Sequence, residues 1–270
     1  MEKAKVLYIA QEITPYLPES HMSKIARFLP QGIQEKGKEI RTFMPRYGKI
    51  NERRNQLHEV IRLSGMNLII DDTDHPLIIK VASIQAARMQ VYFIDNEEYF
   101  QRKAVLNDKD GKYFDDNDER AIFFARGVLE TVKKLRWAPD IIHCHGWMTS
   151  LVPLYVKQIY KDNPLFADAK ITYSLYDDDF SPSFNGNFHK KLLEEGFDKA
   201  DIAHIEKDPS FTNLMKMTID KSDAIIEGSE QINSEVVKYA SDKNVKMLNY
   251  QGDEDYIDAF DAFYDELLND

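Results

Sequence analysis

Residues 139–157 read PDIIHCHGWMTSLVPLYVK, and this stretch decides the fold class of the chain. Pro139 is followed by a short apolar segment that is too brief for a helix and is typical of an interior strand of a parallel sheet. A loop of polar and aromatic residues comes next, and the apolar spacing beyond it predicts a helix that begins near Thr149. Because doubly wound sheets bind ligands at the carboxyl ends of their strands, the sequence predicts a site around His145 and Trp147.

The same alternation of short apolar strands and amphipathic helices continues along the chain. Strands are predicted to start near residues 5, 40, 140, 170 and 223, and a β-rich excursion over 57–95 is predicted to add pairing at one edge of the sheet. A long helix is predicted over 119–135. We therefore predict an α/β fold with one Rossmann-like domain over 1–250. Its sheet is expected to be mainly parallel with helices on both faces, and strands 5–10 and 140–144 to be neighbours or near-neighbours.

Four segments, in order along the chain, resemble the glycogen/starch synthase family. They are 5–50, DDNDERAIFFARGVLE at 115–130, 139–157 and 215–237. For 139–157 the family reads close to PD-V-V-H-x-H-D-W-x-[TS]-x-L-x-P-x-Y, and this chain departs in the loop at Gly146, where the family has Asp. The resemblance implies retaining transfer of glucose from ADP-glucose or UDP-glucose to an α-1,4-glucan. It also implies a GT-B architecture, in which two Rossmann-like halves face each other across a cleft, and this chain resembles only the first half.

Two loops depart from the family where it binds the sugar nucleotide. After the first strand the family carries Lys-Thr-Gly-Gly-Leu, whereas this chain has Pro18-Glu19-Ser20-His21-Met22. Glycines and a lysine at the start of a helix let a diphosphate approach, and Glu19 repels it. At the end of the strand at 171–175 the family has His-Asn, and the register places Tyr176 and Asp177 there. The sequence therefore predicts no catalytic residues.

Seven residues at the strand ends are candidates for ligand binding. They are Ser20, His21, Arg46, His145, Trp147, Tyr176 and Asp177. His145 matches the family histidine that contacts the glucosyl donor, and the alternative is a loop histidine held by backbone hydrogen bonds. Trp147 has a core or helix-packing role as its alternative, and Arg46 is placed at the cleft by analogy of fold.

We predict no metal and no cofactor. The run Asp177–Asp179 offers oxygen ligands to a hard cation, but it lacks the glycine spacing of a calcium loop, and a solvated loop is the alternative. His143 and His145 share one strand face but lack a third zinc ligand at a recognisable spacing. The sequence contains no G-x-G-x-x-G, P-loop, G-x-S-x-G or C-x-x-C motif.

Charge and cysteine content restrict the partners and the compartment. The formal net charge of −11 argues against non-specific binding of nucleic acid. A single cysteine, Cys144, excludes an intrachain disulfide and suits a reducing compartment. The apolar run at 6–10 is too short for a signal peptide or a membrane span, so we expect a cytoplasmic protein without membrane contact.

The C-terminal segment 251–270 carries eight Asp or Glu residues and no Lys or Arg. Its apolar residues recur at helical spacing: Ile257, Phe260, Phe263, Tyr264 and Leu267. This pattern predicts an amphipathic helix docked on the α/β domain, near the basic residues of 24–54. The alternative is that the apolar stripe contacts another subunit.

These observations leave three classes of function open. The prediction is a synthase-like domain that does not transfer glucose by itself and acts by binding a partner protein, a second copy of itself, or a sugar or nucleotide ligand. The first alternative is a glucosyltransferase completed by a separate donor-binding polypeptide, because retaining transfer holds the donor between two halves. The second alternative is a module that binds α-glucan.

Overall fold

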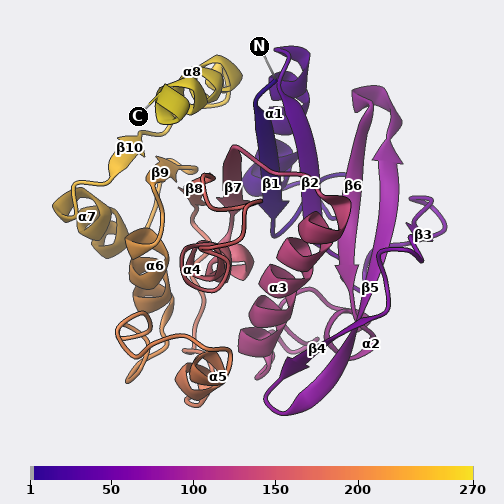
Figure 1. Ribbon diagram of the computed structural model, residues 1–270, viewed down its shortest axis with the longest axis vertical. Coiled ribbons are helices and arrows are strands. Elements are labelled where there is room, and N and C mark those ends of the chain that lie inside the picture. Colours follow the sequence, from indigo (N-terminus) through magenta and orange to yellow (C-terminus); the bar gives the residue numbers. More distant parts are fainter. Residues whose placement is uncertain (1–2, 270) are drawn as a thin grey trace.

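The computed structural model describes residues 3–269, in which ten strands form a sheet ordered β10-β9-β8-β7-β1-β2-β6-β5-β3, with β4 paired to β5 alone (Figure 1). Met1, Glu2 and Asp270, which belong to the predicted domain and C-terminal helix, lie outside the described residues. The strands are β1 Lys5–Ala10, β2 Glu39–Pro45, β3 His58–Glu59, β4 Met66–Ile70, β5 Thr73–Ile84, β6 Met89–Asp95, β7 Ile141–His145, β8 Lys170–Leu175, β9 Ala224–Glu227 and β10 Lys246–Leu248. The α-helices are α1 His21–Glu35, α2 Glu97–Phe100, α3 Asn117–Leu135, α4 Leu151–Gln158, α5 Phe188–Glu194, α6 Phe211–Asp220, α7 Ser234–Asp242 and α8 Tyr256–Asn269.

The centre of the sheet is parallel, which confirms the predicted fold class. β1 lies between β2 and β7, with Tyr8 opposite His143, so the two strands expected to be neighbours pair directly. The β-rich excursion contributes in two ways: β6 continues the parallel sheet beside β2, and β5 turns back antiparallel to β6 at the edge. Within the predicted β-rich excursion, residues 60–65 form no strand: His58 and Glu59 pair with β5, and the chain then turns.

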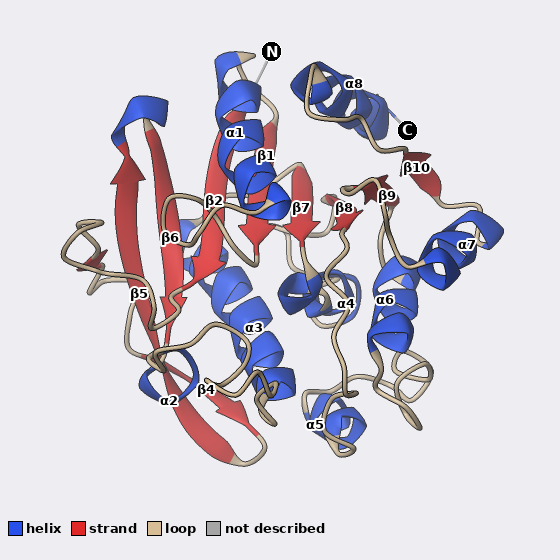
Figure 2. Cartoon of the chain, turned by 180° about the vertical axis from the view of Figure 1, so that it is seen from behind, coloured by secondary structure: helices blue, strands red, loops and turns tan. Residues whose placement is uncertain are grey.

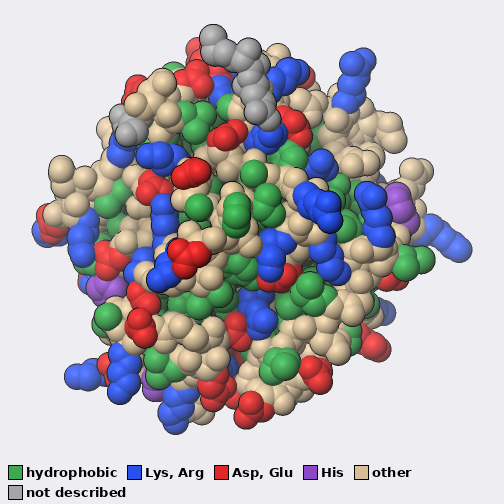
Figure 3. All heavy atoms as spheres, in the orientation of Figure 1, with side chains coloured by type: hydrophobic (Ala, Val, Ile, Leu, Met, Phe, Trp, Pro, Cys, Tyr) green, Lys and Arg blue, Asp and Glu red, His purple; other side chains and the backbone are tan. Residues whose placement is uncertain are grey.

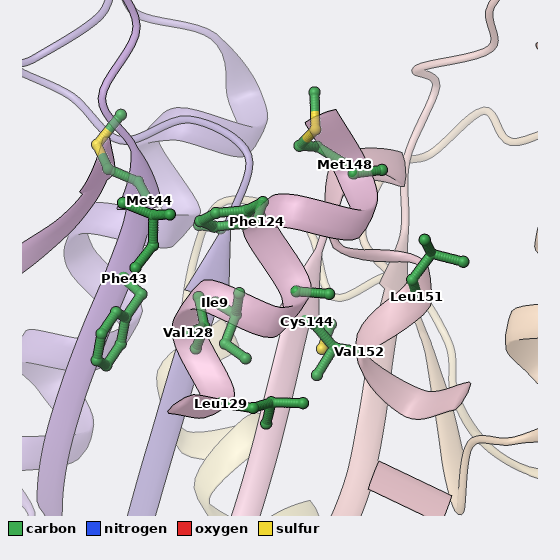
Figure 4. Packing of buried hydrophobic residues seen from close by; sticks show 14 of the residues in the cluster. Ile9, Phe43, Met44, Phe124, Val128, Leu129, Cys144, Met148, Leu151 and Val152 are labelled. Atoms are coloured by element: carbon green, nitrogen blue, oxygen red, sulfur yellow. The ribbon is translucent and has the colours of Figure 1, made fainter. Parts of the chain in front are cut away.

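Helices cover both faces of the sheet (Figures 1 and 2). On one face α3, α4 and α6 bury an extensive apolar core, which includes Ile9 of β1 and Cys144 of β7 (Figure 4). On the other face α1 and α8 pack over β1, β7 and β9. Because side chains alternate along a strand, His143 and His145 lie on the face covered by α1 and α8, whereas Cys144 faces α3 and α4.

The C-terminal helix α8 lies along α1 and closes the second face of the sheet. Its buried residues are Phe260, Phe263, Tyr264 and Leu267. Acidic residues of α8 pair with Lys38, which lies between α1 and β2: its Nζ is 2.6 Å from Asp261 Oδ1 and 2.8 Å from Asp265 Oδ1. Apolar burial dominates this contact, because partly exposed ion pairs contribute little.

Helix α1 begins where the family motif is replaced. Ser20 caps the helix: its hydroxyl accepts the backbone N–H of Ser23 at 3.0 Å, and the Ser23 hydroxyl accepts that of Ser20 at 2.8 Å. This reciprocal capping fixes the first turn of α1 at the carboxyl end of β1. The start of α1 therefore carries the Ser20 hydroxyl and the His21 imidazole where the family motif has glycines.

Candidate functional site

A cavity of about 490 Å³ lies at the carboxyl ends of β1, β8 and β9, beside the first turn of α1, and is called the acidic cleft below. Its lining residues are Gln11, Glu12, Ser20, His21, Met22, Tyr176, Asp177, Asp178, Ser229, Glu230, Gln231 and Tyr250. This position is where open α/β sheets bind ligands, because the loops from successive strands diverge there. Four of the seven candidate residues, Ser20, His21, Tyr176 and Asp177, are brought together in this lining.

His145 lies in the sheet, and it contacts the cleft lining through its backbone oxygen, which accepts the N–H of Gln11, and through its side chain. Its Nδ1 is 2.8 Å from the hydroxyl of Tyr176, which itself lines the cleft, and its ring is fully buried. Burial lowers the pKa of His145 to about 3, so its imidazole is neutral at physiological pH. Tyr176 thus lines the cleft directly after β8, while its hydroxyl is directed to His145.

A second buried histidine, His143, lies beside His145 and connects the sheet to the C-terminal helix. The Nδ1 of His143 is 2.6 Å from the hydroxyl of Tyr264 in α8, and its Nε2 is 2.7 Å from the hydroxyl of Ser174 in β8. The rings of His143 and His145 are 3.9 Å apart between centroids. Burial, with a smaller repulsion from His145, holds the pKa of His143 well below its usual range. Both imidazoles are therefore neutral, structural groups of the sheet.

The near wall of the acidic cleft connects β1 with α1. The hydroxyl of Ser20 donates a hydrogen bond to Glu12, and burial raises the pKa of Glu12 in spite of that bond. His21 is half-buried, and its Nε2 lies 2.7 Å from the backbone oxygen of Gly228. Its Nδ1 faces Asp253 at 3.6 Å. His21 thus bridges α1 to the loops that follow β9 and β10.

The far wall carries a carboxylate that holds the loop after β7. Asp178 accepts the backbone N–H of Trp147 at 2.9 Å, and burial raises the pKa of Asp178 to about 7. Gly146 precedes that tryptophan with φ +86° and ψ 158°, a backbone conformation that is practically restricted to glycine. A Cβ at Gly146 would lie 2.9 Å from the Cβ of Gln11, so the close approach of the segment after β1 also favours glycine.

Two candidate residues lie apart from the acidic cleft. Trp147 is fully buried, and its ring packs edge-on against Phe180 at 5.0 Å, which is the packing role given as its alternative. Arg46 follows β2 and pairs with Glu52, and its Nε lies 3.8 Å from Asp95. These contacts occupy the guanidinium on the side of β6, and Arg46 is not among the residues that line the cleft.

The electrostatic character of the acidic cleft is set by four carboxylates: Glu12, Asp177, Asp178 and Glu230. Within residues 3–269, its lining contains one histidine, His21, and no Lys or Arg. A diphosphate placed here would meet like charge without a permanent cation to offset it. On the face of the molecule shown in Figure 3, by contrast, acidic and basic side chains are interspersed.

A smaller cavity of about 110 Å³ opens beside the loop that follows β8. Its walls are largely aromatic, and the rings of Phe180 and Phe184 stack at 4.5 Å with an interplanar angle of 6°. Tyr113 lines it as well, and Asn117 and Asn185 supply amide groups. Aromatic faces with a few polar groups form a common lining for small uncharged ligands.

Two features are absent from the described part of the chain. No three His, Cys, Asp or Glu side chains among residues 3–269 are grouped so that they could hold a metal ion. Over the same range, no helix has the length and apolar content needed to cross a bilayer.

Comparison with known proteins places this geometry in a family. The family model described as starch synthase catalytic domain matches residues 5–249, which is most of the chain. The chain belongs to the starch synthase catalytic domain family. This confirms the resemblance read from the four sequence segments.

Curated relatives in this family are glycogen synthases. The glycogen synthase of Chlorobium limicola is 40% identical over 173 residues, which are 64% of this chain and 35% of that protein. The glycogen synthase of Pelodictyon phaeoclathratiforme is 33% identical over 234 residues, which are 86% of this chain and 47% of that protein. The chain therefore spans about half the length of the curated relatives it matches, or less.

A solved starch synthase domain shares the fold. The catalytic domain of starch synthase IV from Arabidopsis thaliana, bound to ADP and acarbose, superposes with a TM-score of 0.72. The match covers 92% of this chain and 51% of that chain at 19% sequence identity, so it shows the common GT-B-type architecture.

Several residues of the acidic cleft were missed by reasoning from sequence. Glu12 lies inside a segment that resembles the starch synthase family, and its position directly after the first strand was a signal that could have identified it. Asp178 was visible only as one acid in a run of three. Glu230 and Tyr250 follow β9 and β10, and no motif marks them, so only the topology of the sheet brings them to the cleft.

Proposed function

We propose that this chain is a starch synthase-type domain whose strand-end cleft does not take a sugar nucleotide, and that it acts by binding another molecule instead of transferring glucose by itself. The observation that carries the proposal is the acidic cleft, which holds four carboxylates where the family brings a diphosphate. The helix that faces it starts with Ser20 and His21 in place of the glycines of the family motif.

The local structure supports this proposal in two further ways. Glycine-rich helix starts bind phosphate through exposed backbone N–H groups, but here the Ser20 hydroxyl and the Ser23 hydroxyl take part in capping that end of α1. Tyr176 in turn holds the Nδ1 of His145, the histidine that matches the donor contact of the family. A donor glucose would have to displace that hydrogen bond.

The test of this proposal measures transfer and binding separately. The purified chain is incubated with glycogen and labelled ADP-glucose or UDP-glucose, beside an active glycogen synthase as positive control, and no incorporation is expected. Calorimetry with ADP and ADP-glucose then reports on the cleft alone, and no saturable heat is expected. Incorporation of label, or saturable binding of either nucleotide, contradicts the proposal.

A glucan-binding role is the second candidate, and the aromatic-walled cavity beside β8 favours it. The half-buried rings of Tyr113 and Phe114, beside the stacked and buried rings of Phe180 and Phe184, offer apolar surface on which the C–H face of a sugar ring can pack. Maltooligosaccharides are expected to bind with an affinity that rises with chain length and falls in a Tyr113→Ala variant. Equal affinity for that variant and the parent chain contradicts this candidate without affecting the first.

A further inference from the structure

One side chain in the acidic cleft has an unmet hydrogen-bonding capacity. Gln11 is 4% exposed and lines the cleft directly after β1. Its Oε1 accepts the backbone N–H of Met148 at 3.0 Å, which fixes the orientation of the amide. Its Nε2 is therefore turned away from that loop, and no other residue of 3–269 accepts a hydrogen bond from it. Nε2 remains accessible from the cleft, so a ligand bound there can offer this N–H group an acceptor.

The carboxylates of the acidic cleft favour a positively charged ligand. Glu12 and Asp178 both line the cleft, and each has its pKa raised, mainly by burial. Asp177 and Glu230 are exposed at the mouth. Negative charge gathered in a concave, partly desolvated site attracts a cation and raises its local concentration. A positively charged ligand would also stabilise the ionised forms of the two buried carboxyls.

The cation that fits is organic. The described residues group no three metal-ligating side chains here or elsewhere, which argues against a bare metal ion. A volume of about 490 Å³ falls within the range of roughly 300–1,000 Å³ typical of small-molecule sites. Tyr250 adds an aromatic ring to the lining, and an ammonium group is attracted to such a ring.

We propose that the acidic cleft binds a small polyhydroxylated amine, of the size of one or two amino-sugar rings. The ammonium group is held by the carboxylates of Asp177 and Glu230, and Glu12 and Asp178 lie deeper in the cleft. A hydroxyl oxygen of the ligand accepts a hydrogen bond from Gln11. This inference rests on the proposed function, because it requires a cleft that does not take the nucleotide. The ring hydroxyls supply both donors and acceptors to the remaining amides and hydroxyls of the lining.

The experiment compares two probes that differ in one group. Glucosamine and glucose have the same ring, and glucosamine carries an ammonium group in place of one hydroxyl. Calorimetric titration of the intact chain near neutral pH and low salt is expected to show glucosamine binding at least about tenfold more tightly, which corresponds to about 1.4 kcal/mol. Glucose binding as tightly as glucosamine, or no saturable binding of either sugar, overturns the inference.

Substitutions at the mouth of the acidic cleft test whether glucosamine binds there. Asp177→Asn and Glu230→Gln each remove one exposed charge from the mouth of the cleft, and each is expected to weaken glucosamine binding by about threefold to tenfold. Glu206→Gln removes one charge from an exposed position outside the cleft and is the matched control, with affinity unchanged. Loss of affinity in the control as large as in the two variants overturns the assignment to this cleft.

A third titration separates this inference from the function on which it rests. Saturable binding of ADP-glucose refutes the proposed function. If ADP-glucose does not bind and glucose binds at least as tightly as glucosamine, the proposed function is retained. Only the inference that the cleft binds an amine is then overturned.

Discussion

Replacing His145 with Asn tests whether this histidine is buried in its neutral form, through the pH dependence of the free energy of unfolding. The ring of His145 is fully buried at the end of β7, and burial lowers its pKa from 6.5 to about 3. In the unfolded chain the imidazole is exposed to water and takes up a proton near its ordinary pKa. The unfolded state therefore binds more protons at mildly acidic pH, and the stability associated with His145 falls as pH decreases from 6.5 towards 3.

The size of the effect follows from this difference in pKa. Between pH 6.5 and about pH 4.5 the histidine is protonated only in the unfolded chain, which costs about 1.4 kcal/mol per pH unit, or about 2.7 kcal/mol in total. The His145→Asn variant lacks this term. It also loses packing and the bond to Tyr176, but that loss is present at every pH. Asp178 titrates in the opposite direction in both proteins, so its contribution cancels in the comparison.

Urea unfolding of the parent chain and the variant at about pH 7.5 and about pH 4.5 gives the four free energies required. The stability advantage of the parent chain is expected to shrink by about 2.7 kcal/mol at the lower pH. The same substitution at the exposed His58 is the control, and it should change the free energy of unfolding by no more than about 0.5 kcal/mol. A constant difference between the parent and His145→Asn would refute the reasoning.

Two further predictions concern α8 and the loop after β7. Deleting 252–270 removes four buried side chains of α8, each worth roughly 1.5–3 kcal/mol, and the melting temperature should fall by several degrees. An unchanged melting temperature would show that α8 does not stabilise the domain. Gly146→Ala places a Cβ against the Cβ of Gln11 at φ +86° and should destabilise the fold by roughly 1–3 kcal/mol in urea unfolding. Gly186→Ala is its control, because nothing lies within 4 Å of a Cβ there. Equal effects of the two substitutions would contradict the role of Gly146.

The fold was predictable because its signal is periodic and local. Apolar runs such as 141–145 have the length and composition of interior strands, and alternation with helices leaves few topologies open. The cleft was less predictable, because its residues come from the ends of separate strands. Tyr176 follows β8, as the strand prediction implied, but its hydrogen bond to His145 depends on side-chain direction. The pairing of Arg46 with Glu52 likewise depends on β6 lying next to β2.

The hydrogen bond between His143 and Tyr264 has a consequence for the order in which the protein folds during synthesis. It joins residues 121 positions apart in the sequence, and α8 completes the layer over β1, β7 and β9. The layer formed by α3, α4 and α6 is complete in sequence by Asp220, so it can assemble while the ribosome is still translating the remainder. The two layers of this sheet thus mature at different times. Until α8 emerges, the nascent chain carries a half-covered sheet, and this is the interval in which it most needs protection from aggregation.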